Sequence, residues 1–300
     1  MKRYFVAISL FIFKMACAQY ADPYQAPVYY SVAEAANANK ATQLNLRDQQ
    51  LFHTPENLEK LQSLTFLNLM GNYIEDWDGE LFKLKDLEIL DLKLNKLRYV
   101  PDEIGGMKNL TSLNLSDNSI VFLPDSMGKL KKLEFLYLSN NNLTHIPESI
   151  GKCRSLRVLE LNNNQLSYLP GTIANLKNLK VLHIAYNQFN EFDAQWVALA
   201  ALEDLNMEYN QLKTFPAAIG SLRHLKTVIL NNNKLTAVPD EITELSSLEL
   251  LSLSNNRLTV LPVNISNLKS LKTLILTGNS ISKPEQDRVR AALPGCNVYF

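Results

Sequence analysis

The sequence predicts an α/β solenoid, a curved stack of short units. A parallel β-sheet is expected on its concave side and short helical or 3-10 segments on its convex side. The first observation is an asparagine that recurs every 23 residues without insertion or deletion, and a fixed period of this length is typical of solenoids. The second is a strand-like alternation before each asparagine. The third is a segment led by proline after it.

The recurring asparagine defines the units. The row consists of Asn72, Asn95, Asn118, Asn141, Asn164, Asn187, Asn210, Asn233, Asn256 and Asn279. Gln49 carries the same amide one step earlier, so eleven units are expected within residues 41–283. A buried amide has donors and an acceptor for backbone groups that a turn leaves inside the molecule. We therefore interpret the row as a structural asparagine ladder.

Leucines stand at strand spacing just before each asparagine. Leu90 and Leu92 precede Asn95 and alternate with Asp91 and Lys93. A period of two is that of a strand with one buried face. One unit cannot bury its apolar side alone, but a stack of units forms a continuous core.

The second half of each unit begins with a proline six residues after the asparagine, as at Pro101 and Pro147. Proline fixes φ and lacks an N–H, so it suits the start of a helical turn. Isoleucine and leucine usually follow at intervals of three, as with Ile242 and Leu245. Residues three apart lie on one face of such a turn.

Two units depart from this pattern. Aspartate replaces the proline at Asp78 and Asp193, and Trp77 and Trp196 stand close by. We interpret the tryptophans as fillers of a repacked turn, because cores accept changes that conserve volume. A local bend or a lateral contact site is the alternative.

An open solenoid end exposes core, so both ends need caps. Ser31 and Glu34 form a capping box that opens a short helix, and residues 31–40 are expected to form the N-terminal cap. Residues 19–30, rich in tyrosine and proline, are expected to be a leader that is flexible or orders on docking. Residues 284–300 are expected to form the C-terminal cap, a helix followed by a last strand.

Residues 1–18 have the features of a secretory signal peptide. Lys2 and Arg3 give a basic start, an apolar run follows, and Ala16-Cys17-Ala18 is a small-residue cleavage site. The run is shorter than the roughly 20 residues that span a bilayer. We expect an exported protein that begins at Gln19, without a membrane span.

Two alternatives to this signal peptide stay open. The first is a cytosolic protein with an apolar N-terminus. The second is a lipoprotein anchored through Cys17, which is disfavoured because Lys14 stands where such sites usually carry leucine.

The repeated pattern L-x-x-L-x-L-x-x-N-x-L resembles that of the leucine-rich repeat family. The likeness runs from about residue 41 to residue 300. The second half, L-P-x-x-I-x-x-L, is similar to the subclass of intracellular Ras-group repeat proteins and of many exported bacterial ones. The resemblance implies a horseshoe that recognises proteins along its concave sheet, without catalysis or a cofactor.

Near the middle of the solenoid, the residue composition of the outward strand positions differs from that of the flanking units. Aromatic and charged side chains gather there, which is the composition of a binding hot spot. The candidate ligand-binding residues are Phe135, Tyr137, Glu160, His183, Tyr186, Glu208 and Tyr209. The alternative is that β-sheets favour tyrosine, phenylalanine and valine in any case.

Composition and motifs exclude other classes of function. Formal net charge is zero, which gives no electrostatic case for nucleic acid. Glu160, His183 and Glu208 come from successive units, but they lack the fixed spacing of a metal or acid–base site. We find no nucleophile motif and no glycine-rich phosphate loop, so neither an enzyme nor a metal site is expected.

The sequence therefore predicts an exported module that binds a protein, or alternatively a glycan, through its concave face. The alternative function is a structural or adhesive component of the cell envelope. An enzyme is a distant third.

Overall fold

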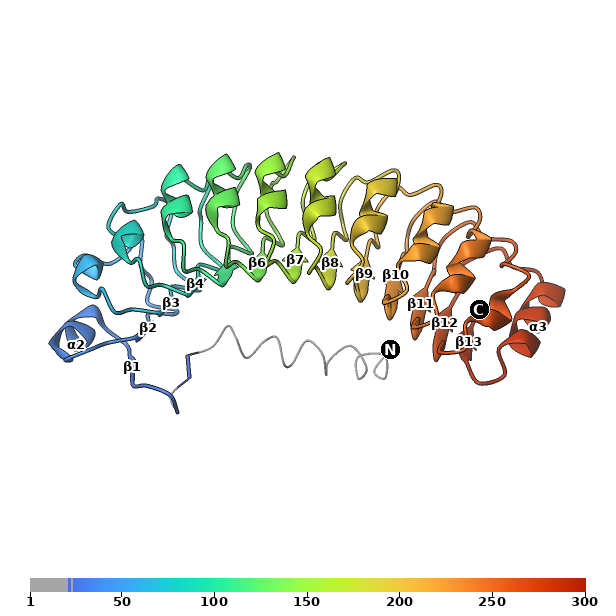
Figure 1. The fold of residues 1–300 in the computed structure, drawn as a ribbon, viewed down its shortest axis with the longest axis horizontal. Helices are drawn as coiled ribbons and strands as arrows, with labels where there is room; N and C mark the ends of the chain where they lie inside the picture. The colour runs from blue at the N-terminus through green and yellow to red at the C-terminus, as the bar shows by residue number, and fades with distance from the viewer. Residues whose placement is uncertain (1–20, 23) are drawn as a thin grey trace.

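The structure, a computed structural model, describes residues 21–22 and 24–300. The predicted signal peptide and the first residues of the leader lie outside this range. The described chain forms an arc with its strands on the concave side and its helical segments on the convex side (Figure 1). The predicted solenoid fold is confirmed.

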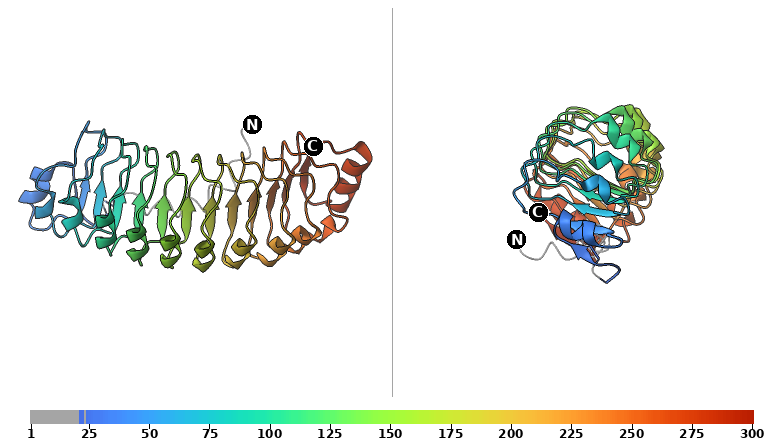
Figure 2. Two further views of the ribbon diagram at one scale, coloured as in Figure 1. Left: turned by 90° about the horizontal axis from the view of Figure 1, so that it is seen from above. Right: turned by 90° about the vertical axis from the view of Figure 1, so that its left-hand side faces the viewer.

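In the described part of the chain, thirteen strands form one parallel sheet in sequence order (Figure 2). The strands are β1 (Val28–Tyr29), β2 (Gln43–Asn45), β3 (Phe66–Asn68), β4 (Ile89–Asp91), β5 (Ser112–Asn114), β6 (Phe135–Tyr137), β7 (Val158–Glu160), β8 (Val181–His183), β9 (Asp204–Asn206), β10 (Thr227–Ile229), β11 (Leu250–Ser252), β12 (Thr273–Ile275) and β13 (Asn297–Tyr299). From β2 to β12 each residue pairs with its equivalent in the next unit, as Leu136 does with Leu159.

Helical segments alternate with these strands. The α-helices α2 (Val32–Asn37) and α3 (Lys283–Ala292) lie at the two ends of the arc. The 3-10 helices are η2 (Leu58–Lys60), η3 (Leu81–Lys83), η4 (Asp102–Gly106), η5 (Asp125–Lys129), η6 (Glu148–Lys152), η7 (Gly171–Asn175), η8 (Ala194–Ala198), η9 (Ala217–Ser221), η10 (Asp240–Glu244) and η11 (Ile265–Asn267). A proline precedes most of the five-residue segments in extended conformation, as Pro147 does before η6.

The periodic leucines and isoleucines form one continuous core between the two layers. Leu136, Leu159, Ile150 and Ile173 are fully buried. Each burial of this kind is worth about 1.5–3 kcal/mol, and it is shared between neighbouring units. The stability of a unit therefore depends on the units beside it.

The asparagine ladder fills the turn at the end of each strand. The amide nitrogen of Asn164 donates to the carbonyl oxygens of Leu161, at 3.0 Å, and Leu138, at 3.0 Å, one unit earlier. Its Oδ1 accepts from the backbone N–H of Leu143 at 3.0 Å. The same arrangement recurs from Asn72 to Asn279. Each amide thus joins two consecutive turns.

Gln49 differs from the asparagines. Its side chain is exposed, and its Nε2 donates to the carbonyl oxygen of Tyr30 at 2.8 Å. The longer side chain reaches outward to the cap, because the first unit has no complete unit before it. Gln49 continues the period of the sequence but not the buried ladder.

Segment 24–30 is ordered against the first unit. Val28 and Tyr29 form β1, which pairs with β2. The side-chain amide of Gln43 donates to the carbonyl oxygens of Asp22 and Ala26, at 2.8 and 3.0 Å. Ser31 then caps α2 by accepting from the N–H of Glu34. A strand therefore lies within the range 19–30 that the sequence predicts as a leader.

The two tryptophans pack inside the turns. Trp196 is 1% exposed and meets Phe189 and Phe192 edge-on. Trp77 stacks on Phe82 and donates to the carbonyl oxygen of Tyr99 at 2.7 Å. This agrees with a repacked turn, and Trp196 has almost no surface left for a lateral contact.

Charged side chains form a row where the strands start. Glu134 pairs with Arg157 at 3.2 Å. Glu203 lies between Lys180 and Lys226, at 2.8 and 2.7 Å. Glu249 pairs with Lys272 at 2.6 Å. The signs alternate from Lys180 to Lys272, so this row adds ion pairs to the backbone pairing of the sheet.

No helix in the part of the chain that the structure describes is long and apolar enough to cross a bilayer.

We expect Asn164→Ala to lower the free energy of unfolding by about 1–3 kcal/mol. It leaves the N–H of Leu143 without its partner and removes one of the two side-chain donors to each of the carbonyl oxygens of Leu138 and Leu161. Chemical denaturation measures this. Asn142→Ala, at an exposed neighbouring site, is the control. Equal unfolding free energies for the two variants would contradict the structural role of the ladder.

Gly128→Ala should also destabilise the protein, by about 1–3 kcal/mol. A Cβ at Gly128 would lie 2.6 Å from the carbonyl oxygen of Ser149 in the next convex segment. Gly79→Ala is the matched control, because its Cβ would meet no atom within 4 Å. If the melting temperature falls equally for both variants, the close contact between neighbouring convex segments at Gly128 does not determine stability.

Candidate functional site

The candidate residues lie on β6, β7 and β8 and on the turns that follow β8 and β9. Phe135 and Tyr137 lie on β6 and are half-buried, while Glu160 ends β7 and His183 ends β8. The paired register places Tyr137 beside Glu160 and Glu160 beside His183. These side chains therefore form one continuous row on the concave face.

Tyr186 and Tyr209 lie outside this row. They occupy the position just before the ladder asparagine, where every unit has a positive φ and the chain turns out of the sheet. This series of turns is here called the left-handed ridge. Its members are Asp48, Gly71, Leu94, Asp117, Asn140, Asn163, Tyr186, Tyr209, Asn232, Asn255 and Gly278. The candidate residues thus form a concave row and a ridge pair, and Glu208 lies in the turn just before Tyr209.

The two ridge tyrosines stack on each other. Their ring centroids are 4.2 Å apart with an interplanar angle of 13°. Tyr186 is 47% exposed and Tyr209 is 45% exposed, so both rings combine mutual packing with a large solvent-facing surface. The stacking follows from the 23-residue period, which sets equivalent side chains about 4.8 Å apart on neighbouring strands.

Left-handed backbone is costly for such residues. Tyr186 has φ of 53° and Tyr209 has φ of 51°. Asparagine, aspartate and glycine tolerate this conformation and fill most other ridge positions, whereas a bulky side chain there is an outlier. Leu94 is the other bulky residue on the ridge. The tyrosines therefore occupy positions where local stability favours a different residue.

The tyrosines also interrupt a hydrogen-bonded series of side chains. Along the ridge, Asn140 donates to Asp117 at 2.7 Å and Asn163 donates to Asn140 at 2.8 Å. The series resumes beyond the tyrosines, where Asn255 donates to Asn232 at 2.9 Å. Phenol rings replace these amide contacts in the two units between.

In the concave row, His183 lies between two carboxylates. Its Nε2 is 3.3 Å from Oδ1 of Asp204, and its Nδ1 is 3.8 Å from Oε1 of Glu160. The His183 side chain is 14% exposed. Asp204 takes the place that the sequence analysis gave to Glu208. The reason is that Asp204 begins β9 and reaches His183 diagonally, whereas Glu208 lies beyond the strand in the turn.

These contacts shift several pKa values. Burial lowers the pKa of His183, but the hydrogen bond and charge of Asp204 and the charges of Glu160 and Glu208 outweigh it, so that the net shift is upward. Burial raises the pKa of Glu160. The pKa of Tyr186 is raised by burial, by Tyr209 and by the charge of Glu208. Glu208 therefore links the concave row electrostatically to the ridge pair.

A metal ion has no ready site here. Among the described residues, no group of three or more histidine, cysteine, aspartate or glutamate side chains has a metal-binding arrangement. The facing carboxylates instead make His183 a favourable site for a proton.

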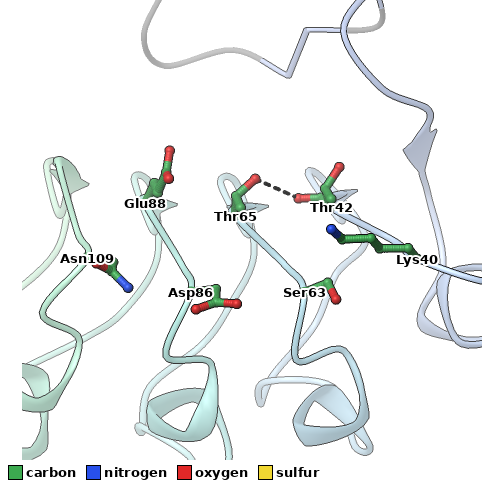
Figure 3. A pocket seen from close by; sticks show the side chains of 7 residues that line it. All are labelled: Lys40, Thr42, Ser63, Thr65, Asp86, Glu88 and Asn109. Atoms are coloured by element: carbon green, nitrogen blue, oxygen red, sulfur yellow. Dashed lines mark hydrogen bonds between the residues drawn. The ribbon is translucent and has the colours of Figure 1, made fainter.

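A second surface feature lies near the first units. A shallow depression of about 310 Å³ is lined by residues of two rows with the 23-residue period, one of them the row that starts the strands (Figure 3). Its lining residues are Lys40, Thr42, Ser63, Thr65, Asp86, Glu88 and Asn109. Thr65 donates to the carbonyl oxygen of Thr42 at 3.2 Å. The mixed, small polar lining offers no aromatic or apolar anchor, which makes it a weaker candidate than the concave centre.

Comparison with known proteins identifies the repeat. A leucine-rich repeat family model matches residues 62–120, 108–166 and 223–281. This chain belongs to the leucine-rich repeat family. A second model, for two leucine-rich repeat copies, matches residues 154–194. The matched ranges include β6 to β8 and Tyr186, whereas β9 and Tyr209 lie between two of them.

Solved leucine-rich repeat structures resemble this one over most of its length. The ectodomain of the Arabidopsis thaliana receptor kinase GASSHO1/SCHENGEN3 is 28% identical, with a TM-score of 0.72 over 91% of this chain and 37% of that one. Internalin InlF from Listeria monocytogenes is 20% identical, with a TM-score of 0.73 over 86% and 73%. A leucine-rich repeat protein from Leptospira interrogans is 29% identical over 92% of this chain and 100% of its own, with a TM-score of 0.40.

The family model establishes the leucine-rich repeat family, and the receptor and internalin structures agree with its fold. Leucine-rich repeat proteins of this fold are typically non-enzymatic modules that bind protein ligands. This chain spans little more than a third of the plant receptor's length. No curated protein matches the chain significantly in sequence.

The His183 cluster should make stability depend on pH. A raised folded-state pKa means that the folded protein binds a proton more tightly than the unfolded chain does. The resulting stabilisation is fully present below the ordinary histidine pKa of 6.5 and is lost as pH rises through the folded-state value. The unfolding free energy of the wild type minus that of His183→Gln should therefore be highest at acid pH and fall as the pH rises above about 6.5.

Chemical denaturation across this pH range measures the difference, with the exposed His224→Gln variant as matched control. A difference that grows with pH would show that burial, and not the two carboxylates, dominates at His183.

Proposed function

We propose that this protein is an exported leucine-rich repeat module that recognises a protein ligand through the centre of its concave face and the adjoining left-handed ridge. The observation that carries the proposal is the exposed, stacked pair of Tyr186 and Tyr209 in left-handed backbone. The fold supplies the surface, and this pair distinguishes one part of that surface from the rest.

The energetic argument rests on the cost of the pair. A residue held in a disfavoured backbone region costs on the order of 1–3 kcal/mol, and such residues concentrate at functional sites. Asn163 and Asn232 show that asparagine fits the adjacent ridge positions and continues the side-chain series. Tyrosine brings no matching structural gain beyond one ring contact. Its large, rigid, half-exposed surface is instead the type that dominates protein interfaces.

A related structure supports a protein ligand. The GASSHO1/SCHENGEN3 ectodomain, 28% identical to this chain, was solved in complex with CASPARIAN STRIP INTEGRITY FACTOR 2. That complex concerns a longer chain, so it supports the class of partner and not its identity.

Export is supported by residues 1–18, with their basic start, apolar run and Ala16-Cys17-Ala18 site. Intact-mass measurement of the protein recovered from outside the cytoplasm tests this. A chain beginning at Gln19 is expected. A mass that includes the first eighteen residues, or a diacylglyceryl group on Cys17, would contradict it.

The ligand-binding role is tested with the double variant Tyr186→Asn/Tyr209→Asn. The wild type is first used to capture proteins from the surroundings of the producing cell. We expect the double variant to bind these proteins more weakly than the wild type by at least about 2 kcal/mol, the usual hot-spot threshold. The melting temperature should stay level or rise, because asparagine relieves the left-handed backbone. Surface plasmon resonance and calorimetry give the two quantities.

Tyr168→Asn is the control, since Tyr168 is 57% exposed but lies outside the strands and the ridge. Unchanged ligand affinity in the double variant would exclude the ridge pair as the recognition site. A melting temperature that falls steeply would instead assign the tyrosines a structural role.

A further inference from the structure

The outward side chains around the ridge pair are acidic. In the fully described units that contain β7, β8 and β9, the outward positions carry Glu160, Asp204 and Glu208 and neither lysine nor arginine. Further along the face, Asp91 is 6% exposed and Asp117 is paired with Lys93 at 3.4 Å. His183 is the one titratable base among the three central units' outward positions, and it lies between two of the carboxylates. The centre of the concave face therefore carries excess negative charge.

The ridge pair lies at the edge of this acidic region. The charge of Glu208 reaches both Tyr186 and His183, raising the pKa of each side chain. Glu208 is held in place from two sides. Its backbone N–H donates to Asn206 at 3.0 Å, and its carboxylate accepts from Asn231 at 3.4 Å. Glu208 and Tyr209 follow β9, and the backbone N–H of Tyr186, after β8, donates to the carbonyl oxygen of Glu208 at 2.9 Å. The carboxylate and the two aromatic rings thus belong to adjoining residues of two neighbouring turns.

Each tyrosine uses one face of its ring in the stack. The opposite faces look along the ridge toward the neighbouring units, where Asn163 and Asn232 stand at equivalent positions. The series of side-chain hydrogen bonds ends at Asn163 and starts again at Asn232. Electron-rich ring faces and a carboxylate together form an environment suited to a cation.

We propose that Tyr186, Tyr209 and Glu208 form a subsite for a cationic side chain, arginine above all, on an extended segment of the protein ligand. This proposal rests on the proposed function and specifies its partner: a protein whose recognised segment is basic. The guanidinium stacks on an exposed tyrosine face while its N–H groups bond the Glu208 carboxylate. The other central carboxylates attract further basic residues of the same segment.

Arginine suits this environment better than lysine. Its planar guanidinium stacks on an aromatic face and bonds a carboxylate at the same time, whereas an ammonium is compact and strongly hydrated. A glycan also stacks on tyrosine, but it would draw no benefit from the excess of carboxylates. Charge complementarity therefore favours a basic protein segment as the occupant.

The test uses a random-peptide phage library, selected in parallel on the wild type and on Tyr186→Asn/Tyr209→Asn. Peptides that bind the wild type and not the variant are sequenced and synthesised. We expect them to be enriched in arginine. Replacing that arginine with neutral citrulline should lower wild-type affinity by about tenfold, equivalent to about 1.4 kcal/mol, and raised salt should weaken binding.

Glu208→Gln should remove most of this discrimination between arginine and citrulline, while Glu103→Gln, an exposed carboxylate on η4, should preserve it. This comparison separates a specific contact with Glu208 from a general loss of negative charge. If replacing arginine with citrulline lowers the affinity for the wild type and for Glu208→Gln equally, the role of Glu208 is overturned.

Failure of this subsite is distinguishable from failure of the proposed function. One contrary result is that the selected peptides that need the two tyrosines are not enriched in arginine, and another is that they lose no affinity when arginine is replaced with citrulline. Either result overturns the cationic subsite but leaves protein recognition by the ridge pair in place. A library that yields no tyrosine-dependent peptide overturns the subsite. If a glycan array then gives tyrosine-dependent binding, a protein ligand is overturned as well.

Discussion

The asparagine amide that joins one turn to the next is the interaction on which the rest of the structure depends. Each strand is only two or three residues long, too short to hold a sheet through its own hydrogen bonds. The buried amide satisfies two carbonyl oxygens and one N–H at every turn, so that the chain can reverse inside the molecule without unpaired groups. The fixed length of the unit follows, because an inserted residue would displace that amide from its partners.

Periodicity made the architecture predictable from sequence. The alternation of Leu90 and Leu92 with polar residues, the proline at Pro147 and the asparagine row together specify strand, convex segment and turn, and the structure confirms the solenoid. Gln49 marks a limit of this reasoning. Its amide fits the period, but an amide is buried only where a complete unit precedes it. The period of the sequence alone does not show whether such a unit is present.

The candidate site was only partly predictable. The residue types were visible, but the alternation rule counts Tyr186 and Tyr209 as ordinary outward strand residues, whereas both lie in left-handed turns. Asparagine, aspartate and glycine at the equivalent positions of other units were the available signal. The contact between His183 and Asp204 was missed because neighbouring strands also meet diagonally, and a comparison of equivalent positions identifies only direct neighbours.

The charged row at the start of the strands has a consequence for how the chain assembles. Units of equal length and similar core are interchangeable partners during folding, and repeat proteins are prone to misassembly of this kind. Between Lys180 and Lys272, however, a strand that skipped its neighbour and joined the next one would place like charges together, such as Lys180 against Lys226. The sign of the charge therefore differs between neighbouring units and is the same in units two apart. Repulsion between like charges disfavours the out-of-sequence pairing that the uniform leucine core would accept.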